Sequence, residues 1–231
     1  MPGAPIRHFE VDPAKLDAIH DCMAHYDVGS PDAEWPNNII SRKTVVYGSG
    51  RISRGAPVDH AVDPDELDLC RRLASQAKEI MKGVDVGMGS ESGDPFREFF
   101  IAANMGEPAP KKIDADLVRS RFGGTIFPPA TITVEPLAES GTWWSEVLYD
   151  GSESGVEYFV PWRAMIKWFR SQAAFVDSAF VRIGDSEALF VVDKESYPDG
   201  TVITGCVLPR LALGLTKNGS LAGLFGFCVQ T

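Results

Sequence analysis

The sequence of 231 residues is 44% hydrophobic and 23% charged, a balance that is typical of soluble globular proteins and excludes an intrinsically disordered chain. Its formal net charge of −10 disfavours sequence-independent electrostatic binding to nucleic-acid phosphates or to an anionic membrane. No apolar run approaches the length that spans a bilayer. We therefore expect neither a nucleic-acid partner nor a membrane partner.

The cysteines are far apart and form no Cys-x-x-Cys pair, which argues against a zinc ribbon or a thioredoxin-type motif. Each falls in an apolar pattern and is expected to be a small buried hydrophobic residue: Cys22, Cys70, Cys206 and Cys228. The N-terminus lacks the basic and apolar regions of a signal peptide. We expect a reduced, cytoplasmic protein.

In the first half of the chain, three Asp-Pro pairs predict helix starts, because Asp caps a helix and Pro suits its first position. They are Asp12-Pro13, Asp63-Pro64 and Asp94-Pro95. Glu66 follows Asp63 by three residues, which predicts a capping box. The third helix would carry the stripe Phe96, Phe99, Phe100 and Ala103. A strand over residues 39–47 and a short helix over residues 113–118 complete this half.

After Gly123-Gly124 the pattern favours strands. Alternation predicts strands over residues 130–135, 143–149 and 156–160, followed by a helix over residues 161–174. The remaining extended runs cover residues 179–183 with 188–192, then 201–216 and 220–229. Asn218-Gly219 between the last two is a strong hairpin signal. The last run is apolar on both faces, so it should lie inside the sheet or be covered on both sides. We expect an α+β fold: a helical N-terminal half packed on a mainly antiparallel C-terminal meander with one covering helix. The chain reads as one domain over residues 1–231, with a possible subdivision near residue 123 into a mainly helical part (1–122) and a mainly β part (123–231).

The motifs of common enzyme and metal sites are missing or incomplete. The segment from His20 to His25 is rich in metal-ligating residue types, but at helical spacing His20 points away from Cys22 and His25. The Gly87-Met88-Gly89 sequence lacks the third glycine and the βαβ context of a dinucleotide site. We expect no metal and no cofactor. No catalytic residue can be named, and whether the protein is an enzyme is left open.

The helix after Pro161 offers the strongest binding hypothesis. Its buried stripe is expected to comprise Trp162, Met165, Ile166, Phe169 and Ala173. Arg163, Lys167 and Arg170 form a basic row beside this stripe, with Trp168 on another flank. In an acidic protein such a row can receive a carboxylate, a phosphate or an acidic partner. The alternative is that the three cations pair with Glu146, Glu153 or Glu157 while their stems cover the sheet.

Two classes of function follow from these observations. The first is a non-enzymatic binding or regulatory protein that engages a macromolecule, by expectation another protein, through its acidic surface and the aromatic-basic helix face. The second is an enzyme or small-ligand carrier with a pocket lined by Trp143, Trp144 and Trp162. A closed pocket with a tryptophan and an ionisable group would favour the second class. A filled interior with exposed apolar side chains would favour the first.

Overall fold

The computed structural model describes residues 62–89, 92–93, 95–122, 131–184 and 207–229. The helix expected after Asp12-Pro13, the strand at 39–47, the run at 188–192 and the segment from His20 to His25 lie outside these residues. None of the described helices is both long enough and apolar enough to cross a membrane.

Six strands form one sheet in which every pairing is antiparallel. They are β1 (Ser92–Gly93), β2 (Arg97–Ile101), β3 (Ile132–Pro136), β4 (Phe175–Ile183), β5 (Val207–Thr216) and β6 (Leu221–Val229). Strands β3 to β6 are neighbours in sequence order, and β1 and β2 both pair with the free edge of β6. This meander, combined with helices, confirms the α+β class.

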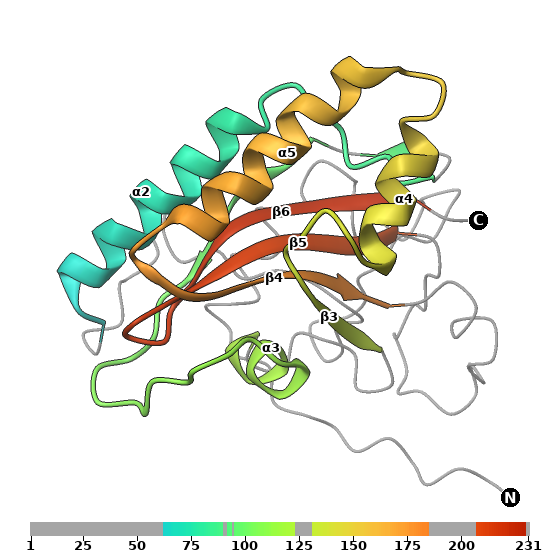
Figure 1. Ribbon diagram of the computed structural model, residues 1–231. Coiled ribbons are helices and arrows are strands. Elements are labelled where there is room, and N and C mark those ends of the chain that lie inside the picture. Colours follow the sequence, from blue (N-terminus) through green and yellow to red (C-terminus); the bar gives the residue numbers. More distant parts are fainter. Residues whose placement is uncertain (1–61, 90–91, 94, 123–130, 185–206, 230–231) are drawn as a thin grey trace, which may run out of the picture.

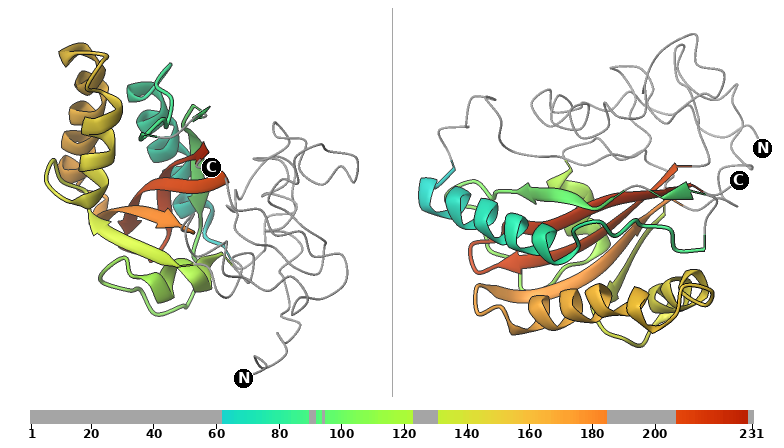
Figure 2. Two further views of the ribbon diagram at one scale, coloured as in Figure 1. Left: turned by 90° about the vertical axis from the view of Figure 1, so that its right-hand side faces the viewer. Right: turned by 90° about the horizontal axis from the view of Figure 1, so that it is seen from above.

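The helices lie on both faces of the sheet (Figures 1 and 2). One face carries α2 (Pro64–Ile80), α4 (Thr142–Asp150) and α5 (Val156–Ser171). The short helix α3 (Ala115–Arg121) is followed by Phe122, whose ring stacks on Phe99 of β2 at a centroid distance of 5.7 Å. Phe100, the neighbour of Phe99, points to the opposite side and packs with α2.

The β5–β6 hairpin and the central place of β6 were predicted correctly. Gly219 has φ +88°, a backbone conformation that glycine adopts without strain. The amide of Thr216 donates to the carbonyl of Ser220 at 2.9 Å and closes the turn. Strand β6 pairs with β5 on one side and with β1 and β2 on the other, and its described apolar side chains are buried: Leu221, Ala222, Leu224, Phe225 and Cys228.

The helix predicted from Asp94-Pro95 is wrong, because residues 97–101 form strand β2. The sequence of this segment fits the alternation of a strand and the periodicity of a helix equally well. In the strand, Phe99 and Ile101 face one side, and Phe100 and Ala102 face the other. This short segment pairs with the edge of β6, for example at Phe99↔Gly223, which are 124 residues apart in the sequence. The pairing supplies hydrogen-bond partners for its backbone amides and carbonyls.

The strands predicted over residues 143–149 and 156–160 are also wrong. The first is helix α4, in which Trp143, Trp144 and Val147 are buried at helical spacing. The second is the start of α5, which contains Pro161 rather than beginning there. Because proline has no amide hydrogen, the carbonyl of Glu157 lacks its usual donor four residues on. Glu157 is exposed, so water can serve that carbonyl.

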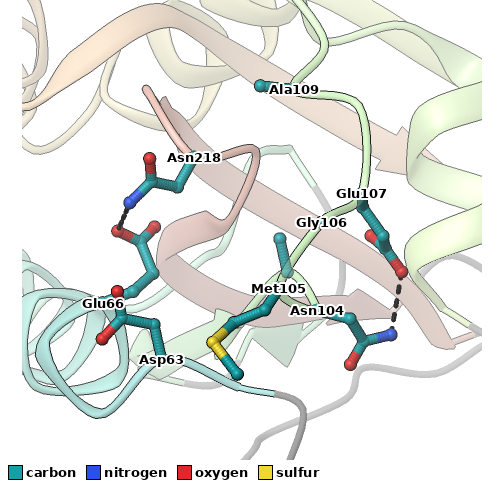
Figure 3. Close-up of a pocket in the computed structure, with 9 residues that line it drawn as sticks. Asp63, Glu66, Asn104, Met105, Gly106, Glu107, Ala109 and Asn218 are labelled. Carbon is teal, nitrogen blue, oxygen red and sulfur yellow. Dashed lines mark hydrogen bonds between the residues drawn. The ribbon is translucent and has the colours of Figure 1, made fainter.

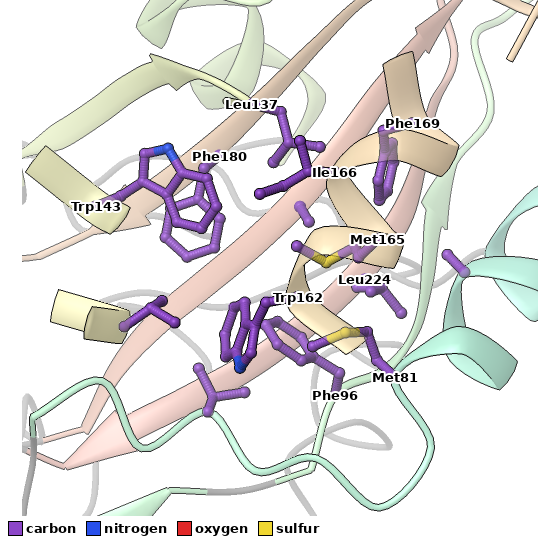
Figure 4. Close-up of a cluster of buried hydrophobic side chains, with 14 of the residues drawn as sticks. Met81, Phe96, Leu137, Trp143, Trp162, Met165, Ile166, Phe169, Phe180 and Leu224 are labelled. Carbon is purple, nitrogen blue, oxygen red and sulfur yellow. The ribbon is translucent and has the colours of Figure 1, made fainter. Parts of the chain in front are cut away.

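One core cluster lies between α5, α4 and the sheet (Figure 4). Trp143 stacks on Phe180 of β4 at 4.5 Å, and Phe96 meets Trp162 edge to face at 5.6 Å. The expected inward stripe of α5 is buried in full at Trp162, Met165, Ile166 and Phe169. The expectation for Ala173 is wrong, because this residue follows the end of α5 and is exposed.

Candidate functional site

Helix α5 belongs, with α2 and α4, to the outer layer of helices on one face of the sheet (Figures 1 and 2). A turn from Gly151 to Gly155 reverses the chain after α4, and Gly155, with φ +79°, precedes the first residue of α5. Since one side of α5 packs on the sheet, the residues on its other side face away from the core.

The three predicted cations line one open groove of about 570 Å³. Arg163, Lys167 and Arg170 come from α5, and the opposite wall comes from the connection between β3 and α4. We call this the basic groove; its lining residues are Ala138, Glu139, Ser140, Arg163, Ile166, Lys167, Arg170 and Ser171. Spacings of four and three residues place the cations on one flank of the helix, as the sequence predicted.

The cations of the basic groove are weakly neutralised. Arg163 Nε lies 3.7 Å from Glu139 Oε1, and both side chains are about half exposed, at 49% and 52%. Exposed pairs of this kind contribute between 0 and about 1 kcal/mol. Within the described part of the chain, Lys167 and Arg170 have no ion-pair partner. Glu146, which the alternative interpretation offered as a partner, contacts Arg182 and Arg210 instead.

Trp168 lies apart from the basic groove. Its ring is half-buried and packs edge to face on Phe169 at 4.8 Å and on Phe175 at 5.9 Å. It contacts the core cluster under α5 as well as the cluster that α2 shares with β2 and β6. Trp168 therefore joins α5 to its neighbour α2, and its role in binding stays a prediction.

Exposed apolar side chains gather in sequence around the α4–α5 turn. Val156 and Val160 of α5 are 74% and 59% exposed, and Leu148 and Tyr149 of α4 are exposed as well. The alternating pattern of residues 156–160 predicts a strand, so it does not indicate this exposed helix face. The spacing of four residues between the two valines was the available signal for a shared helix face.

The tryptophan-lined pocket of the alternative function does not occur among the described cavities. Trp143, Trp144 and Trp162 are 0%, 4% and 0% exposed. Trp143 contacts the other two rings at centroid distances of 5.4 and 6.5 Å. The three indoles fill the core, and none of them lines the basic groove or either of the two acidic cavities described next.

Two other cavities are acidic. One, of about 250 Å³, lies beside Asp63, Glu66 and Glu107 (Figure 3). The other, of about 480 Å³, includes Asp150, whose carboxylate accepts a hydrogen bond from the Tyr158 hydroxyl. Burial and this neighbouring carboxylate raise the pKa of Tyr158. Among the described residues, no cluster of three or more histidine, cysteine or acidic side chains could hold a metal ion.

Comparison with protein-family models and with the sequences of curated proteins gave no match.

Proposed function

We propose that this is a non-enzymatic binding or regulatory protein that holds an acidic segment of a partner protein in the basic groove. One observation carries the proposal: Arg163, Lys167 and Arg170 converge on an open groove in a chain whose net charge is −10. Lys167 and Arg170 are available because no described residue pairs with them.

The chemistry of the groove suits carboxylates. A guanidinium presents a planar fork of donors to a carboxylate, and a lysine adds a compact point charge. The net negative charge of the rest of the molecule would repel the long polyanionic backbone of a nucleic acid and an anionic membrane. A short acidic protein segment, which can meet three cations without covering the acidic surface, fits better. In this proposal the protein acts in the cytoplasm.

The alternative of an enzyme or small-ligand carrier gains no support from the tryptophans, because their rings pack against one another and against Phe180. The filled core and the exposed valines of α5 are what the first class of function requires.

Binding of a labelled poly-L-glutamate peptide of about 15 residues, measured at low salt, tests the proposal. We expect K167E/R170E to weaken binding about tenfold or more, because two attractive contacts become repulsive. The matched control K111E/K112E makes the same change in net charge on exposed lysines away from the groove, and should alter affinity less than about twofold. Equal losses in both variants, or no binding to the unmodified protein, would contradict the proposal.

A further inference from the structure

The exposed face of α5 carries an apolar row directly beside its cations. Val156, Val160 and Ala164 recur every four residues and are all exposed; we call them the apolar ridge. Phe159, Arg163 and Lys167 recur at the same interval and form the adjacent ridge. Rows of side chains four residues apart are the ridges that interdigitate when two helices pack. Two such rows side by side give this face of α5 the form of a helix-docking surface.

From this pattern we infer that the partner segment is an amphipathic α-helix. It lies along α5 with apolar side chains on the apolar ridge and acidic side chains toward Arg163, Lys167 and Arg170. This inference rests on the proposed function, and it adds the conformation of the partner and a second contact surface.

The dimensions and side-chain sizes of α5 favour a helix. From Val156 to Arg170 the exposed face extends for roughly 21 Å, the length of about four helical turns. Ala164 has the smallest side chain at the centre of this face, so a partner backbone can approach closely there. Valines that are 74% and 59% exposed lose water-accessible apolar area when they are covered, which stabilises the complex.

Other occupants match less of this surface. An extended acidic strand presents side chains alternately to two sides and would leave either the cations or the valines uncovered. If two copies of α5 packed antiparallel about a two-fold axis, the same flank of one helix would contact that flank of the other. The cation rows of the two copies would then face each other and repel. An acidic amphipathic helix satisfies both rows together.

Three labelled peptides of about 16 residues separate these occupants, and the first two are built from Glu, Leu and Ala. The first has Leu and Glu at helical spacing, the second has the same composition with alternating order, and the third has a central proline in the first sequence. We expect the first to bind the intact protein at least about tenfold more tightly than the other two, with a gain in helical circular dichroism.

Variants then assign the contacts. V156S/V160S should reduce the preference for the helical peptide to about twofold while leaving weak glutamate-dependent binding. V176S, at an exposed valine of β4, is the matched control and should keep the full preference. Equal affinity for the helical and alternating peptides, with K167E/R170E still weakening binding about tenfold or more, would overturn the helical partner and leave the proposed function standing. If K167E/R170E changes nothing, both proposals fail. A dimer in sedimentation that V156S/V160S dissociates would overturn the inference in favour of a second copy of the chain.

Discussion

Arg182 and Arg210 lie directly opposite each other on β4 and β5, on the face of the sheet that α4 covers. Glu146 of α4 contacts both: its Oε1 is 2.7 Å from a terminal nitrogen of Arg182, and its Oε2 is 3.8 Å from Nε of Arg210. Glu135 of β3 lies 3.2 Å from Arg182. Arg210 is only 3% exposed and the other three side chains are partly buried, so two like charges share a largely buried site that the two carboxylates neutralise.

Replacing Glu146 with Gln should destabilise the protein strongly. The change keeps the shape of the side chain but removes the only described carboxylate that contacts Arg210. Removing one partner of a buried ion pair leaves an uncompensated charge, at a cost of about 3 kcal/mol. Urea unfolding at neutral pH measures this difference. The control E139Q removes a half-exposed carboxylate and should change the free energy of unfolding by less than about 0.5 kcal/mol. Equal effects of the two variants would show that the buried cluster is not needed for stability.

Glu66 should matter more to stability than the helix cap beside it. The sequence predicted a capping box, and Asp63 does cap α2 by accepting from the amide of Asp65 at 2.9 Å. The carboxylate of Glu66 instead accepts hydrogen bonds from the side chains of Thr216 and Asn218, the second at 2.9 Å (Figure 3). Glu66 therefore ties α2 to the β5–β6 hairpin.

E66A should lower the free energy of unfolding by about 2–3 kcal/mol, because it leaves two polar partners without their acceptor. D63A should lower it by about 1 kcal/mol, the usual effect of losing a cap. Chemical denaturation of both variants compares these values. A larger loss of unfolding free energy in D63A than in E66A would mean that the helix cap contributes more to stability than the link between α2 and the hairpin.

Gly223 of β6 tolerates no side chain. A methyl group at this position would overlap the carbonyl oxygen of Ala212 on β5, and backbone cannot move there without breaking the strand pair. We expect G223A to lose more than about 3 kcal/mol or fail to fold. G214A is the comparison variant, since its methyl group would meet a side chain, the ring of half-buried Phe175, rather than the backbone of a neighbouring strand. Similar thermal stability of both variants would contradict this difference.

Cys70 should make stability fall at alkaline pH. Burial and the nearby carboxylate of Glu66 raise the pKa of its thiol from 9.0 to about 12. The unfolded chain therefore releases this proton at a lower pH than the folded protein does. Below about pH 9 the contribution is fully present, and it declines as pH rises toward about 12. At about pH 10 the loss should reach roughly 1 kcal/mol, the equivalent of about one pH unit above the ordinary pKa of the thiol.

The measurement compares the free energy of unfolding at about pH 8 and about pH 10 for the intact protein and for C70A. Other titrating groups are the same in both proteins, so the steeper decline of the intact protein isolates Cys70. Parallel declines would contradict the assignment. Cys70 and Cys228 are both free and buried, as predicted, whereas Cys22 and Cys206 lie outside the described residues.

Part of the candidate site was predictable because its signal is local. Arg163, Lys167 and Arg170 share a flank through helical spacing alone, and this flank forms one wall of the basic groove. The opposite wall, with Glu139 and Ser140, could not be predicted, because only packing brings the β3–α4 connection against α5. The apolar ridge could not be predicted in the same way, because Pro161 is typical of a helix start and so places Val156 and Val160 outside the predicted helix.

By itself, the sequence determined the α+β class, helix α2, the inward stripe of α5 and the Asn218-Gly219 hairpin, since each depends on contacts between near neighbours. Only the tertiary structure decided that residues 97–101 are a strand, that residues 142–150 are a helix and that Arg182 meets Arg210. A short apolar run satisfies helix and strand periodicity about equally. Contacts with residues distant in the sequence then decide between helix and strand. For β2 this contact is the edge of β6, and for the helix that carries Trp143 it is the ring of Phe180.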